Sequence, residues 1–143
     1  MTSKSAVVRY LPVVARIVLG AIFFGSGIFG MLMAFGVVPM PVPKPPPSEA
    51  AAAFMGGLMK SGYLFQLIKA TEIVAGALLL SGRFVPLALI LLVPIVVNIF
   101  FVHVRLMPQG LPVALLLVIL EAYLGFAYRD SFRPLFAPRA QPS

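Results

Sequence analysis

The sequence contains no cysteine, no tryptophan, one histidine and only four acidic residues among 143. The lack of cysteine excludes disulfides, thiolate nucleophiles, iron–sulfur clusters and cysteine-ligated zinc. One histidine is too few for a multi-histidine metal site. Charged residues make up only 10% of the chain and hydrophobic residues 61%, whereas ordinary soluble domains are about 25% charged. These values exclude a soluble globular enzyme, a disordered chain and a nucleic-acid-binding module.

Four apolar stretches are long enough to cross a hydrocarbon core about 30 Å thick as helices. They cover residues 17–38, 63–80, 84–104 and 111–128. The first run is longer than the apolar region of a signal peptide and lacks a small-x-small cleavage site, so we interpret it as a retained span. The predicted fold is therefore an all-α integral membrane four-helix bundle, with residues 1–143 forming a single transmembrane domain.

The predicted loop between the first two spans, residues 39–62, begins with a proline-rich segment. Six prolines within residues 39–48 exclude a helix there and favour an extended chain. Ser48 followed by Glu49 indicates a helix start, and residues 49–60 are predicted to form a short interfacial helix, since they are too few to span. The polar tail, residues 129–143, is expected to fray.

Basic residues lie unevenly in the predicted loops, which gives an orientation. By the positive-inside rule, the side with more lysine and arginine faces the cytoplasm. Both termini are then cytoplasmic and the proline-rich loop faces outward. The seven residues on one side are Lys4, Arg9, Arg16, Arg83, Arg129, Arg133 and Arg139, and the three on the other are Lys44, Lys60 and Arg105.

Polar side chains within the spans form the candidate site. Gln66, Lys69 and Glu72 follow one another at intervals of three, so they share a helix face, and Lys69 and Glu72 are spaced to form an ion pair. A charge at the centre of a span costs at least about 2.5–3.5 kcal/mol, so it is expected to face partners or water. The candidate buried polar site comprises Gln66, Lys69, Glu72, Asn98, His103 and Glu121.

Two interpretations of this candidate site stay open. It is either a satisfied polar core that fixes helix register, or a site for a proton, a small polar solute or a quinone head group. Lys69 compensates only one carboxylate, so the second glutamate is expected to be protonated or hydrated. Asn98 and His103 are five residues apart and are expected on different helix faces. No catalytic residue and no metal ligand is predicted.

Three stretches resemble the DoxX-like family of small four-helix bacterial membrane proteins. They are ARIVLGAIFFGSGIFG (residues 15–30), KATEIVAGALLLSGRFVPLALILLVPIVVNIFFVH (residues 69–103) and AYRDSFRPLF (residues 127–136). The resemblance implies a four-helix bundle in the cytoplasmic membrane and an association with redox enzymes, since the family is named after a subunit of a thiosulfate:quinone oxidoreductase. It points to Glu72 and His103 as positions of the family pattern, with Asn98 beside them, but it implies no catalysis.

The function expected from the residues and the resemblance is that of an accessory subunit beside a redox or respiratory membrane enzyme. A quinone is the candidate cofactor, and the expected partners are membrane lipid and other membrane or redox subunits, or further copies of the chain. The alternatives are a proton-coupled small-molecule transporter, which would use the buried carboxylates, and a purely structural membrane scaffold.

Overall fold

The computed structural model describes residues 2–136 and Pro138, with side chains from Val7 onward. This part of the chain is helical and contains no strand. Its elements are α1 (Thr2–Ala34), α2 (Glu49–Lys60), α3 (Leu64–Ser81), α4 (Val85–Arg105), the 3-10 turn η1 (Pro108–Gly110), α5 (Leu111–Ala127), α6 (Arg129–Phe132) and the 3-10 turn η2 (Arg133–Phe136).

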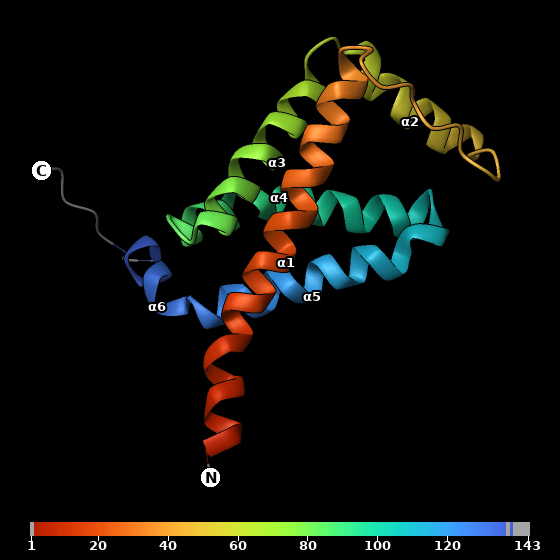
Figure 1. The fold of residues 1–143 in the computed structure, drawn as a ribbon. Coiled ribbons are helices and arrows are strands. Elements are labelled where there is room, and N and C mark those ends of the chain that lie inside the picture. Colours follow the sequence, from red (N-terminus) through yellow and green to blue (C-terminus); the bar gives the residue numbers. More distant parts are fainter. Residues whose placement is uncertain (1, 137, 139–143) are drawn as a thin grey trace, which may run out of the picture.

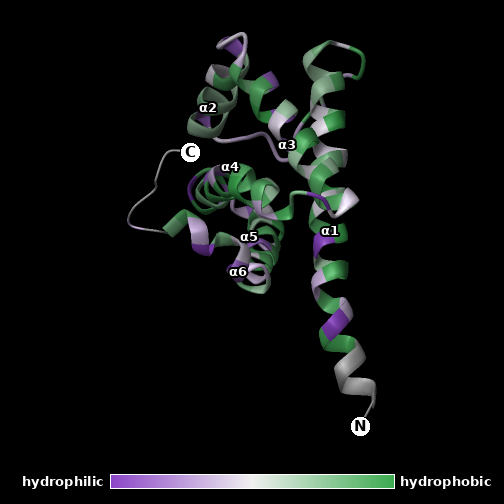
Figure 2. Ribbon diagram, turned by 90° about the vertical axis from the view of Figure 1, so that its left-hand side faces the viewer, coloured by the Kyte–Doolittle hydropathy of each residue, from purple (hydrophilic) through white to green (hydrophobic). Residues whose placement is uncertain are grey.

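Four of the described helices are long and apolar enough to span a membrane, which makes the chain a multi-pass membrane protein. This confirms the predicted all-α four-helix membrane bundle. The helices form two pairs: α1 lies beside α3, and α4 lies beside α5 (Figure 1). The two pairs cross, so that α4 and α5 are seen nearly end-on where α1 is seen from the side (Figure 2). The short helix α2 packs on α3.

Helix α1 differs most from its predicted span at both ends. It continues from Thr2 through Arg16, because a charge ends an apolar run without ending a helix. It ends at Ala34, before the prolines. Gly36 has a φ of +72°, and the amide of Val37 donates to the Leu32 carbonyl over 2.9 Å. This is a Schellman motif, in which a left-handed glycine closes the helix.

The remaining boundaries lie close to those predicted. Helix α2 has the expected bounds, and the Ser48 hydroxyl caps it by accepting a hydrogen bond from the Ala51 amide. Helices α3, α4 and α5 each begin and end within one residue of the predicted spans. The expectation that the tail frays directly after residue 128 is wrong for its first part, because α6 and η2 continue the chain as short helical turns to Phe136.

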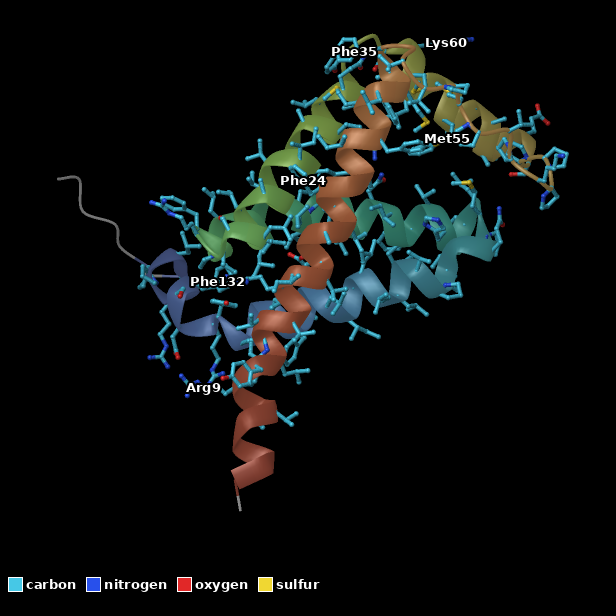
Figure 3. The ribbon with its side chains drawn as sticks, viewed as in Figure 1. Arg9, Phe24, Phe35, Met55, Lys60 and Phe132 are labelled. Atoms are coloured by element: carbon cyan, nitrogen blue, oxygen red, sulfur yellow. The ribbon has the colours of Figure 1, made fainter. Side chains whose placement is uncertain are left out.

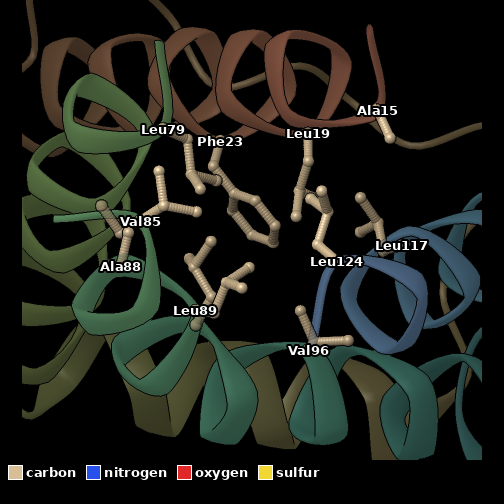
Figure 4. Packing of buried hydrophobic residues seen from close by; sticks show 12 residues of the cluster. Ala15, Leu19, Phe23, Leu79, Val85, Ala88, Leu89, Val96, Leu117 and Leu124 are labelled. Carbon is tan, nitrogen blue, oxygen red and sulfur yellow. The ribbon is translucent and has the colours of Figure 1, made fainter. Parts of the chain in front are cut away.

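The apolar core gathers at the end of the bundle that holds the turn between α3 and α4. Phe23 of α1 lies at its centre, between Leu79 of α3, Leu89 of α4 and Leu124 of α5 (Figure 4). Each of these side chains is almost fully buried. The core therefore joins all four long helices at one end, and the polar side chains of α3 and α4 lie toward the other end.

Glycines allow α1 and α3 to approach at backbone distance. A Cβ placed on Gly27 would lie 2.9 Å from the Ile73 backbone nitrogen and 3.0 Å from the Lys69 carbonyl oxygen. A Cβ placed on Gly76 would lie 2.5 Å from the backbone nitrogen of Phe24, which Figure 3 labels on α1. Small residues at a helix interface commonly permit such packing in membranes. Gly27 of α1 and Gly76 of α3 thus act as packing residues.

We expect Gly27→Ala to destabilise the protein and Gly25→Ala not to. The added methyl group of Gly27→Ala meets backbone atoms, which cannot move aside, and such overpacking typically costs about 1–3 kcal/mol. A Cβ on Gly25, in the same helix, has nothing within 4 Å. Unfolding midpoints in detergent measure both variants, and equal midpoints would contradict the close α1–α3 contact.

Candidate functional site

The centre of the site is an ion pair within α3. The Lys69 Nζ donates to Glu72 Oε1 over 3.0 Å and to Oε2 over 2.9 Å, which confirms the pair expected from their spacing. The Ser26 hydroxyl of α1 donates to the same Oε2 over 2.6 Å. Glu72 is only 2% exposed. The carboxylate is therefore buried with three hydrogen bonds, which is the condition under which a buried charge is tolerated.

The position of the Lys69 side chain depends on a glycine in the neighbouring helix. Its methylene groups lie across Gly30 of α1, where an added Cβ would come within 2.5 Å of Lys69 Cδ. The ammonium group lies 5.5 Å from the centre of the Phe65 ring, within the range of a cation–π contact. The lysine is thus held between a glycine of α1, an aromatic ring and its own carboxylate partner.

A cavity of about 580 Å³ adjoins the ion pair. Its walls come from α2, from the first half of α3 and from the second half of α4, with Ser26 of α1 and Met107 completing them. Aliphatic, aromatic and methionine side chains form most of the lining. The polar members are Ser26, Lys69, Glu72, Asn98 and His103.

His103 is fixed in this wall by its own helix. Its Nδ1 lies 2.8 Å from the Ile99 carbonyl oxygen, and because a carbonyl only accepts, Nδ1 carries the hydrogen. With the hydrogen on Nδ1, the neutral form of the ring has Nε2 as an acceptor. The Cδ2–Nε2 edge packs against Gly110, where a Cβ would collide with the ring. The turn after α4 therefore helps to hold the imidazole.

Asn98 and His103 line the same cavity, although their spacing of five residues places them on different faces of α4. The cavity covers a wide arc of α4, to which residues 94, 95, 98, 99, 102 and 103 contribute. This arc spans two adjacent helix faces. A spacing of five residues therefore still places both side chains at one cavity.

Gln66 and Glu121 do not line this cavity. Glu121 is 8% exposed on the core-facing side of α5, between Leu117 and Leu124, and neither carboxyl oxygen has a hydrogen-bond partner within the described residues. Gln66 is half-buried at the start of α3, and its Oε1 also lacks a partner there. The six candidate residues are thus divided: four surround one cavity and two lie elsewhere.

Two contributions to the site were not predicted. Ser26 of α1, which stands between two glycines, donates to the Glu72 carboxylate. Helix α2 supplies Phe54, Met55 and Leu58 to the cavity wall. The apolar side chains of α2 were visible in the sequence, but nothing in their spacing indicated which helices they would meet.

Comparisons of the chain with protein-family models, with curated proteins and with solved structures gave no match.

We expect Glu72→Leu to destabilise the protein more than the double variant Lys69→Met/Glu72→Leu. The single variant leaves a largely buried ammonium group without its carboxylate, and breaking a buried pair in this way costs about 3–5 kcal/mol. The double variant removes both charges and keeps the side-chain volume. Unfolding in detergent of Lys69→Met, Glu72→Leu and the double variant measures the coupling energy between the two side chains.

The exposed pair of Asp130 and Arg133 provides a matched control, since it has the same spacing and a distance of 3.2 Å. Asp130→Asn should change stability by less than about 1 kcal/mol, because exposed pairs contribute little. A Glu72→Leu effect no larger than that of Asp130→Asn would contradict the structural importance of the buried pair.

Proposed function

We propose that the protein is an accessory membrane subunit of DoxX-like type, which binds a quinone-class molecule beside a redox or respiratory enzyme. The observation that carries this proposal is the cavity that joins apolar walls to Lys69, Asn98 and His103. Small-molecule sites are typically about 300–1,000 Å³ in volume, mostly apolar, with a few polar groups that orient the ligand. The cavity of about 580 Å³ fits that description.

The polar groups of the cavity suit a ligand head group that carries oxygen atoms at its edge. The Asn98 amide both donates and accepts, and the neutral imidazole of His103 accepts at Nε2. The Lys69 ammonium has three hydrogens, and its bonds to Glu72 leave one for a ligand carbonyl. A quinone carbonyl accepts from Lys69 or Asn98, and a quinol hydroxyl donates to His103. An isoprenoid tail would lie along the apolar wall.

The accessory role follows from the residue types that the chain has. Without cysteine, the chain supplies no thiol–disulfide couple and no iron–sulfur ligands. Within this proposal, the electron-transferring groups therefore belong to a partner, and this chain holds the quinone near it. The resemblance of residues 15–30 and 69–103 to the DoxX-like family supports the same assignment.

We also propose that the cavity opens toward the outer face of the bacterial cytoplasmic membrane. Arg9 and Arg16 lie in the first half of α1, Arg83 in the turn between α3 and α4, and Arg129 and Arg133 after α5, whereas the side with α2 carries Lys44, Lys60 and Arg105. Arg139 and the side chain of Lys4, which also entered the count of basic residues, lie outside the described residues. The positive-inside rule then places both termini in the cytoplasm.

Binding of a short-chain ubiquinone to the purified protein in nanodiscs tests the ligand. Isothermal titration should show saturable binding that Asn98→Leu weakens about tenfold, which corresponds to about 1.4 kcal/mol, the loss of one good hydrogen bond. Gln109→Leu likewise replaces an amide side chain by leucine, but at an exposed position outside the cavity, and should leave the affinity unchanged. No saturable binding, or equal affinities for the two variants, would contradict the quinone site.

Affinity purification in a mild detergent tests the accessory role. Mass spectrometry should identify subunits of a membrane redox enzyme with the wild-type chain. The Asn98→Leu chain should retain them, because only one side chain of the cavity wall is changed, but the enzyme's quinone-dependent turnover should fall. Purification of the chain alone, or an unchanged turnover, would favour the scaffold instead.

A further inference from the structure

A second cavity, of about 550 Å³, lies between α2 and the proline-rich loop, and methionines dominate its lining. Five of the chain's seven methionines line it: Met33, Met40, Met55, Met59 and Met107. Of the other two, Met31 does not line it, and residue 1 lies outside the described residues. The thioether groups of the chain are thus concentrated around one space.

These methionines come from separate parts of the chain. Met33 belongs to the last turn of α1, Met40 to the loop, and Met107 to the segment after α4. Met55 and Met59 are four residues apart on α2, so their side chains lie on one face and reach the same space. Figure 3 shows sulfur atoms in the region of the labelled Met55. The fold therefore brings thioethers together that are distant in sequence.

Filling of an irregular core is the usual role of methionine, because its side chain is flexible. That role predicts that the side chains close the gap they border. Here a space of about 550 Å³ remains among them. The methionines thus border an open space that they do not fill, and its lining offers sulfur lone pairs.

We propose that this cavity is a binding site for a soft monovalent cation, Cu(I), held by the thioethers of Met55 and Met59 together with those of the facing methionines. Thioether sulfur is a soft ligand that favours Cu(I), whereas divalent Mg²⁺ and Ca²⁺ require carboxylate or carbonyl oxygens. The lining contains no carboxylate, and its only charged residue is Lys60, which is largely exposed. This environment disfavours a divalent ion and leaves a singly charged, weakly hydrated ion as the fitting occupant.

Competition with bicinchoninate, under anaerobic reducing conditions, tests the site on the full-length protein in detergent. The wild-type protein should withdraw one Cu(I) per chain from the chelator, and Zn(II) should not bind at the same concentration. The double variant Met55→Leu/Met59→Leu should bind Cu(I) at least tenfold more weakly. Leucine has nearly the volume of methionine, so the fold should be retained, and circular dichroism verifies this.

Met31→Leu is the matched control, since it removes a thioether that does not line the cavity, and it should bind as the wild type does. X-ray absorption of the loaded protein should show sulfur as the only type of first-shell ligand. Absence of Cu(I) uptake, equal affinity of the double variant and the wild type, or loss of uptake in His103→Asn but not in the double variant would each overturn the proposal.

Discussion

The ion pair between Lys69 and Glu72 is the interaction on which the organisation of this bundle depends. Two charges inside a membrane-spanning helix are stable only when they are paired and hydrogen-bonded. The structure meets this condition by bringing α1 close: Ser26 donates to the carboxylate, and Gly30 leaves room for the lysine methylenes. Replacing either residue by a larger one would therefore disturb both the helix contact and the charges.

That requirement divides the bundle into two ends with different roles. From Ala15 to Phe23, α1 contributes apolar side chains to a close-packed core, and from Ser26 to Gly30 it faces the polar groups. The core joins α3 and α4 near their connecting turn. Because the pairs α1–α3 and α4–α5 cross, α3 and α4 separate toward their other ends, where the cavity lies. The packed core near the α3–α4 turn thus positions α3 and α4 so that their other ends enclose the cavity.

The sequence allowed the spans and the ion pair to be predicted, because both depend on local spacing. An apolar run of about 20 residues and an interval of three residues are properties of a single helix. The joint cavity of Asn98 and His103, and the separation of Glu121 from Glu72, depend instead on how helices are rotated and crossed. Equal depth in the membrane fixes a residue's height and not its direction around the helix axis. For this reason the sequence could not show that Glu121 faces the apolar residues of the core and not Lys69.

Helix α2 connects the two cavities, because Met55 lines both of them, as do Phe65 and Met107. A ligand that repositions these side chains in one cavity changes the wall of the other. Any such effect on binding affinity must be reciprocal, since coupling between two sites is a single free energy. Outside its capping residue and its contact with α3, α2 has few attachments within the described chain, and only Ala51 is fully buried. The wall that the two sites share is therefore also a helix with few contacts to the rest of the bundle.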